Sequence, residues 1–120
     1  MLFKIIKKLG WAWEGLQFVF KNELSFRIEF FACLLVVIAG FIFQLGRIEW
    51  FFILFGIALI FSLEFLNTAV ERILNFFHPK EHPEVKVIKD IAAGAVLIAN
   101  VLAGTVGFLI FLPHVLSLWR

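Results

Sequence analysis

The segment WFFILFGIALIFSLEFLNTAVERILNFF, residues 50–77, decides the fold. It is apolar over a length that suits a membrane-spanning helix, because one span needs about 20 residues. Glu64, Asn67 and Glu71 interrupt it, and at about 100° per residue they fall within roughly 60° of arc on one helix face. An ionised carboxylate at a helix centre costs roughly 2.5–3.5 kcal/mol on insertion, and such groups are candidate functional sites. The simpler alternative is a polar seam that only joins neighbouring helices.

The composition is that of an integral membrane protein. Of the 120 residues 62% are hydrophobic, 17 are Phe, and only 17% are charged. Long apolar runs with this composition indicate membrane spans, and the chain has room for three. We therefore predict an all-α integral membrane fold in a single membrane domain over residues 1–120, with transmembrane helices at about 28–46, 49–77 and 90–118.

Residues 1–22 predict an amphipathic helix that lies in the membrane surface. They have dispersed lysines and no small-residue cleavage site after an apolar core, so they do not read as a cleavable signal peptide. A helix with one apolar and one basic face suits the lipid–water boundary. The apolar face comprises Leu2, Ile5, Ile6, Leu9, Trp13, Leu16 and Phe20, and the polar face Lys4, Lys7, Lys8, Glu14 and Lys21.

The basic residues predict the orientation of the chain. They gather before the first span and around the loop between the second and third, whereas the other ends carry only Arg47 and Arg120. The positive-inside rule places the N-terminus and the second loop in the cytoplasm and the C-terminus outside. The net charge of +2 is better explained by this topology than by nucleic-acid binding.

This orientation gathers the unusual polar residues in the cytoplasmic interfacial layer. They are Glu23, Glu64, Asn67, Glu71, Lys89 and Asp90. Carboxylates that hold Mg²⁺ and a lysine that neutralises phosphate are what phosphoryl transfer needs, since its catalysis is mostly positioning and electrostatics. No glycine-rich nucleotide loop of a familiar kind is present. From the residues alone, a cation or phosphate site in the membrane is the furthest conclusion.

Three segments resemble the prokaryotic diacylglycerol kinase family, which includes undecaprenol kinases. They are NELSFRIE (22–29), EFLNTAVE (64–71) and KDIAAGAVLIA (89–99), in that order. The resemblance implies a homotrimer of three-span protomers with a surface helix, whose active sites form between protomers at the cytoplasmic interface. It also implies transfer of the γ-phosphoryl group of MgATP to a lipid hydroxyl, in a bacterial inner membrane.

The resemblance further assigns roles by matching motif positions. Glu64 corresponds to the catalytic base, and Glu23 and Glu71 to the metal ligands. Asn67, Glu29 and Ala93 correspond to supporting or lipid-substrate residues. The implied ATP-binding residues are Lys4, Trp11, Glu23, Glu71, Lys80, Glu81, His82, Lys89 and Asp90.

The lipid acceptor stays open between diacylglycerol and undecaprenol. Ala92 and Ala93 after the Lys-Asp pair resemble the undecaprenol kinases, whereas Glu29 resembles the diacylglycerol kinases. Asn75 stands where the family often has Asp, and Lys4 and Trp11 where it often has Arg and Tyr.

Two other classes of function compete with a lipid kinase. A small proton- or cation-coupled transporter would use Glu64 and Glu71 as exchange sites, although a transporter more naturally keeps its carboxylate near the midplane. A membrane interaction protein would use the polar face only for helix packing. In the third span Ala95, Ala99, Ala103 and Gly107 recur every four residues, which predicts a close helix–helix contact.

Overall fold

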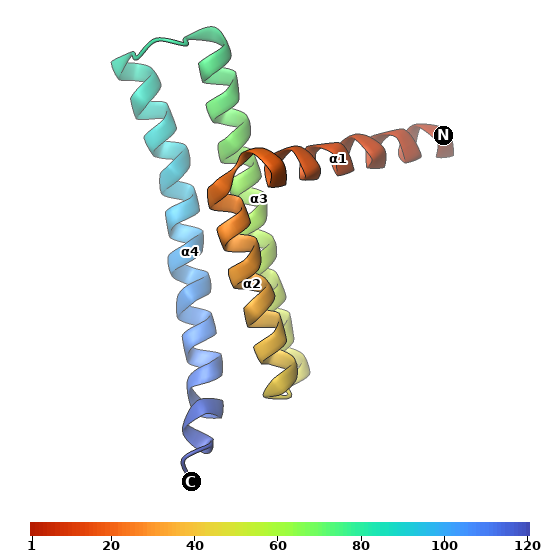
Figure 1. The fold of residues 1–120 in the computed structure, drawn as a ribbon, viewed down its shortest axis with the longest axis vertical. Coiled ribbons are helices and arrows are strands. Elements are labelled where there is room, and N and C mark those ends of the chain that lie inside the picture. Colours follow the sequence, from red (N-terminus) through yellow and green to blue (C-terminus); the bar gives the residue numbers. More distant parts are fainter. The chain divides into compact units, whose positions relative to one another are not determined.

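A computed structural model describes all residues from 1 to 120 and contains four helices and no strand (Figure 1). The helices are α1 (Leu2–Asn22), α2 (Leu24–Ile42), α3 (Arg47–Phe77) and α4 (Pro83–Ser117). The last three are long and apolar enough to cross a membrane. The prediction of an all-α chain with three candidate spans is confirmed.

The chain divides into two compact units, residues 1–32 and 33–120. In the first unit, α1 gives way to α2 at Glu23, whose backbone N–H donates to the Val19 carbonyl. The Arg27 guanidinium donates to the carbonyls of Phe20 (3.0 Å) and Lys21 (2.7 Å). The last carbonyls of a helix lack partners within it and attract cations, so Arg27 stabilises the end of α1.

The second unit contains the second half of α2 and a tight turn from α2 into α3. The Leu45 N–H donates to the Gly40 carbonyl (3.1 Å) and the Gln44 N–H to the Phe41 carbonyl (3.3 Å). This is a Schellman motif, in which the residue at the Gln44 position takes the left-handed conformation. Gln44 has φ 54°, a value that favours glycine. The buried Leu45 side chain closes the motif against Gly40.

Helices α3 and α4 lie side by side and antiparallel (Figure 1). Glu49 at the start of α3 bonds to His114 near the end of α4, with 3.0 Å between Oε2 and Nε2. In the middle, Gly56 lets α4 come close, because a Cβ there would lie 3.3 Å from the Cβ of Ala103. Of the small residues predicted to mediate a helix contact, Ala103 lies at the contact, whereas Gly107 faces open space.

The loop between α3 and α4 is bounded by two prolines. Pro79 follows the end of α3, and Pro83 is the first residue of α4. His82 caps α4, since its Nδ1 accepts the Glu84 N–H at 3.1 Å. Proline suits a first helical position because its missing N–H has no partner there in any case. Helix α4 therefore starts seven residues before Asp90, ahead of the apolar run.

Most large apolar side chains lie on the surface of the single chain. Phe76 is 81% exposed and Ile98 71%, and no large side chain is fully buried. An apolar exterior of this extent is expected where lipid or other transmembrane helices cover the protein.

Candidate functional site

The polar face of α3 runs from a buried position to an exposed one. Glu64 and Thr68 are buried at 7% and 5% exposure, Asn67 and Glu71 are half-buried, and Asn75 is exposed. Glu64 and Thr68 continue the buried face that Ile53 and Ile60 begin, because all four recur at helical spacing. These polar side chains thus form a row along the face predicted for Glu64, Asn67 and Glu71. Their exposure increases toward the α3–α4 loop.

Asn67 and Glu71 are joined directly. The Asn67 Nδ2 group donates to Glu71 Oε1 at 3.2 Å, one helical turn away. The Asn67 Oδ1 atom is buried and accepts no hydrogen bond. A buried polar atom without a partner is unusual and indicates a ligand, an ion or a further protein group.

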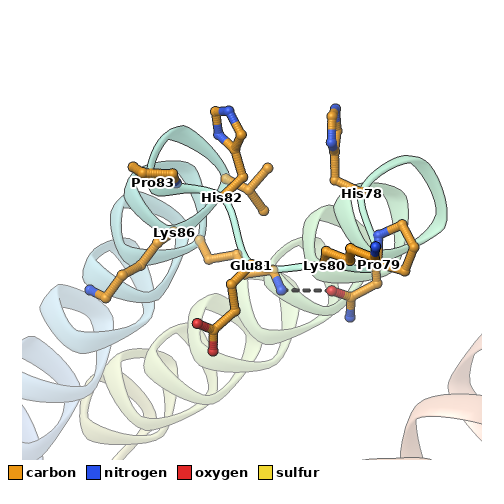
Figure 2. Close-up of a pocket in the computed structure, with 10 residues that line it drawn as sticks. His78, Pro79, Lys80, Glu81, His82, Pro83 and Lys86 are labelled. Atoms are coloured by element: carbon orange, nitrogen blue, oxygen red, sulfur yellow. Dashed lines mark hydrogen bonds between the residues drawn. The ribbon is translucent and has the colours of Figure 1, made fainter.

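The α3–α4 loop surrounds a pocket of about 660 Å³, a volume typical of small-molecule sites (Figure 2). In Figure 2 the side chains of His78 and His82 project to one side of the loop and that of Glu81 to the other. Three ammonium groups favour a polyanion in this pocket. Its polar lining includes Asn75, Lys80, Glu81, His82, Lys86 and Lys89.

The two motif residues at the start of α4 have separate partners. Lys89 Nζ donates to Asn75 Oδ1 at 2.6 Å, a bond that connects α4 to the last turn of α3 (dashed in Figure 2). Asp90 pairs with Lys86 at 2.7 Å, one turn earlier on the same helix. Sequence reasoning missed Asn75 and Lys86 as members of this cluster. Lys86 could have been found from its four-residue spacing to Asp90, and Asn75 from its position one turn after Glu71.

The remaining predicted site residues lie in the first unit or elsewhere on α4. In the first unit Lys4 and Trp11 are exposed, two turns apart on one face of α1, and Glu23 and Glu29 are half-buried. Ala93 is exposed on α4, one turn after Lys89. Within the second unit, the structure brings Lys80, Glu81, His82 and Lys89 to one pocket.

Comparison with known proteins decides the family. Residues 10–111 match the sequence profile of prokaryotic diacylglycerol kinase. The chain belongs to the prokaryotic diacylglycerol kinase family. It is 39% identical over 110 residues to an undecaprenol kinase of Bacillus subtilis, covering 92% of this chain and 89% of that one. It is 36% identical over 115 residues to a diacylglycerol kinase of Synechocystis (95% and 66% covered) and 32% over 100 residues to one of Escherichia coli (83% and 82%).

As a member of this family the protein is a lipid kinase, as the resemblance predicted. Its three apolar helices and bacterial relatives place it in a bacterial inner membrane, with the bilayer and a lipid substrate as partners. The choice between enzyme, transporter and interaction protein is settled in favour of the enzyme.

The residues present also fit a hard divalent cation. No three His, Cys, Asp or Glu side chains gather into a metal cage. Mg²⁺ does not need one, because it usually binds one or two carboxylates together with substrate phosphates and waters. The Glu71 carboxylate, bonded to Asn67 and one helical turn before Asn75 of the pocket lining, has the chemistry of such a ligand.

Proposed function

We propose that this lipid kinase transfers the γ-phosphoryl group of MgATP to the hydroxyl of a membrane lipid. The observation that carries the proposal is the continuity between the buried carboxylate row and the lysine-lined pocket. Glu64, Glu71 and Asn75 follow one face of α3, and Asn75 bonds to Lys89 of the pocket. The reaction has two reactants, and this row provides a place for each. The lipid hydroxyl lies at the Glu64 end and the triphosphate of ATP at the Asn75 end.

Glu64 is the proposed general base. Its carboxylate is buried on a membrane helix, where only a lipid substrate brings a hydroxyl. The lipid oxygen attacks the γ-phosphorus, the bond from that phosphorus to the β,γ-bridging oxygen breaks, and ADP leaves. Glu64 accepts the hydroxyl proton, a transfer that contributes typically 10²–10⁴-fold to such rates.

Glu71 and Glu23 are the proposed Mg²⁺ ligands, Glu71 supported by Asn67 and Glu23 assigned by its motif. When bound, the metal neutralises charge on the phosphate oxygens of ATP. Asn67 holds Glu71 through its 3.2 Å hydrogen bond, which keeps the carboxylate from rotating toward other partners. Mutation of a group that orients a metal ligand typically costs about 10–100-fold in metal affinity or activity.

The nucleotide is proposed to occupy the α3–α4 loop pocket. Lys89 and Lys80 face the phosphates there, and His82 and Glu81 line the same space. Asp90 is connected to the pocket through its ion pair with Lys86, which lines it. Lys4 and Trp11 are assigned to the same ATP site by their motif positions, and Glu29 and Ala93 to the lipid side.

We propose that three chains assemble into a homotrimer with shared sites, that α1 lies in the membrane surface, and that the N-terminus and the α3–α4 loop are cytoplasmic. The basic residues of α1 and of the loop support this orientation. The exposed apolar sides of α2, α3 and α4 support coverage by lipid and by further copies.

The test uses the purified protein in mixed micelles with MgATP and either diacylglycerol or undecaprenol. Labelled γ-phosphate should appear in one of the two lipids, and the preferred acceptor gives the substrate. A folded protein that binds MgATP but labels neither lipid would contradict the proposed acceptors. Failure to bind MgATP at all would contradict the proposed phosphoryl donor.

A further inference from the structure

The hydrogen bond between Lys89 and Asn75 joins the two helices at the proposed nucleotide pocket. Its donor and acceptor are 2.6 Å apart. Asn75 lies in the last turn of α3 and Lys89 in the second turn of α4. Both side chains line the pocket.

The chemistry of this pair is unambiguous. A lysine ammonium only donates hydrogen bonds, so it is the amide oxygen of Asn75 that accepts. The amide is neutral, and Lys89 keeps its full positive charge while one of its three N–H groups is engaged. The other two N–H groups stay available for phosphate oxygens. A lysine otherwise loses considerable rotamer freedom when it binds an anion, because four side-chain bonds must be fixed.

We propose that Asn75 is a positioning residue for the nucleotide site: it holds the Lys89 ammonium over the pocket without neutralising it. This inference rests on the proposed function, since it assumes that Lys89 contacts the phosphates of ATP. In this role Asn75 acts through Lys89 and takes no part at the reacting atoms. Removing it should therefore weaken nucleotide binding and leave the chemical step unchanged.

The first test replaces the amide with a methyl group. Asn75→Ala should raise the KM for MgATP about tenfold, the lower end of the effect of losing one hydrogen bond to a charged group, with kcat within twofold of the parent. The KM for the lipid acceptor should not change. The matched control is Ser117→Ala, which removes an exposed hydrogen-bonding side chain at the opposite end of α4 and should alter neither constant.

A double-mutant cycle separates positioning from a general structural effect. In a Lys89→Met background, Asn75→Ala should cause no further loss of MgATP affinity, measured by calorimetric titration, because there is no ammonium left to hold. Additive losses in the double variant would overturn the proposal. A shift in kcat equal to that in KM would overturn it as well.

The outcome also distinguishes this inference from the proposed function. A parent protein that does not bind MgATP contradicts the proposed function itself. A parent that binds MgATP, together with an Asn75→Ala variant that binds it equally well, contradicts only the role of Asn75. Because Asn75 is exposed, the variant should fold like the parent, and size-exclusion chromatography and circular dichroism check this.

Discussion

Glu64 is the only charged side chain that the fold buries. If it accepts the lipid proton, Glu64→Gln removes the base and preserves shape, so kcat should fall at least about 100-fold. MgATP affinity should stay within twofold, because the amide deletes no metal ligand. Parallel rate and calorimetric measurements check both values, with Glu14→Gln on α1 as the control. Loss of nucleotide binding in Glu64→Gln would argue that Glu64 belongs to the metal site.

Asn67 and Glu71 make a second residue-scale prediction. Asn67→Ala removes the bond that orients Glu71, so the Mg²⁺ concentration for half-maximal activity should rise about tenfold. Glu71→Gln should raise it further, because it removes a ligand. A magnesium titration at saturating ATP measures both midpoints. If neither midpoint moves, Glu71 does not ligate the metal.

The sequence alone was enough to single out Glu64, Asn67 and Glu71, since their spacing on one helix fixes a shared face. It did not pair Lys89 with Asn75, because that contact depends on the register of α4 against α3. The register is set by distant contacts such as the one between Gly56 and Ala103, which periodicity within one helix does not contain.

At the scale of elements, two substitutions at the α2–α3 turn should change the stability of the fold in opposite directions. Gln44→Gly removes a left-handed non-glycine residue and should stabilise the fold by about 1 kcal/mol. Gly40→Ala should destabilise it by about 1–3 kcal/mol, because the new Cβ would lie 2.6 Å from the Trp50 ring. Thermal unfolding in detergent compares the two. A Gln44→Gly variant less stable than the parent would show that residue 44 does not take the left-handed conformation in solution.

The opposite ends of α3 and α4 provide a third contact that holds the helix pair in register. Glu49 accepts the Gly46 N–H at 3.0 Å and also meets His114. Both side chains are about one-third exposed, so the coupling between them should be modest, about 0.5–1 kcal/mol. A double-mutant cycle of Glu49→Gln and His114→Ala, read by unfolding, measures it. Zero coupling would mean that the pair contributes nothing to register.

Helix boundaries were harder to predict than helices. The apolar run from Ile91 predicts a span, but Pro83 and the His82 cap start α4 well before it. Capping is local chemistry that hydropathy does not measure. The consequence matters for function, because the added turns carry Lys86 and Lys89 to the pocket.

For the whole molecule, composition and run length were sufficient to predict an all-α chain with three candidate spans, since a bilayer permits few alternatives. The arrangement of protomers does not follow from one chain. Glu23 belongs to the first unit and Glu64 to the second, so a site that contains both depends on how units or neighbouring chains assemble.

Mixed oligomers test whether that site is shared. If each site takes Glu23 from one protomer and Glu64 from its neighbour, then Glu23→Gln and Glu64→Gln chains are each inactive alone. Randomly mixed in equal amounts, they should recover about a quarter of the parent activity, because one neighbour pair in four joins two intact residues. Mixing Glu64→Gln with Glu64→Ala chains is the control and should recover nothing. Activity that stays at background in the first mixture would mean that each chain carries a complete site of its own.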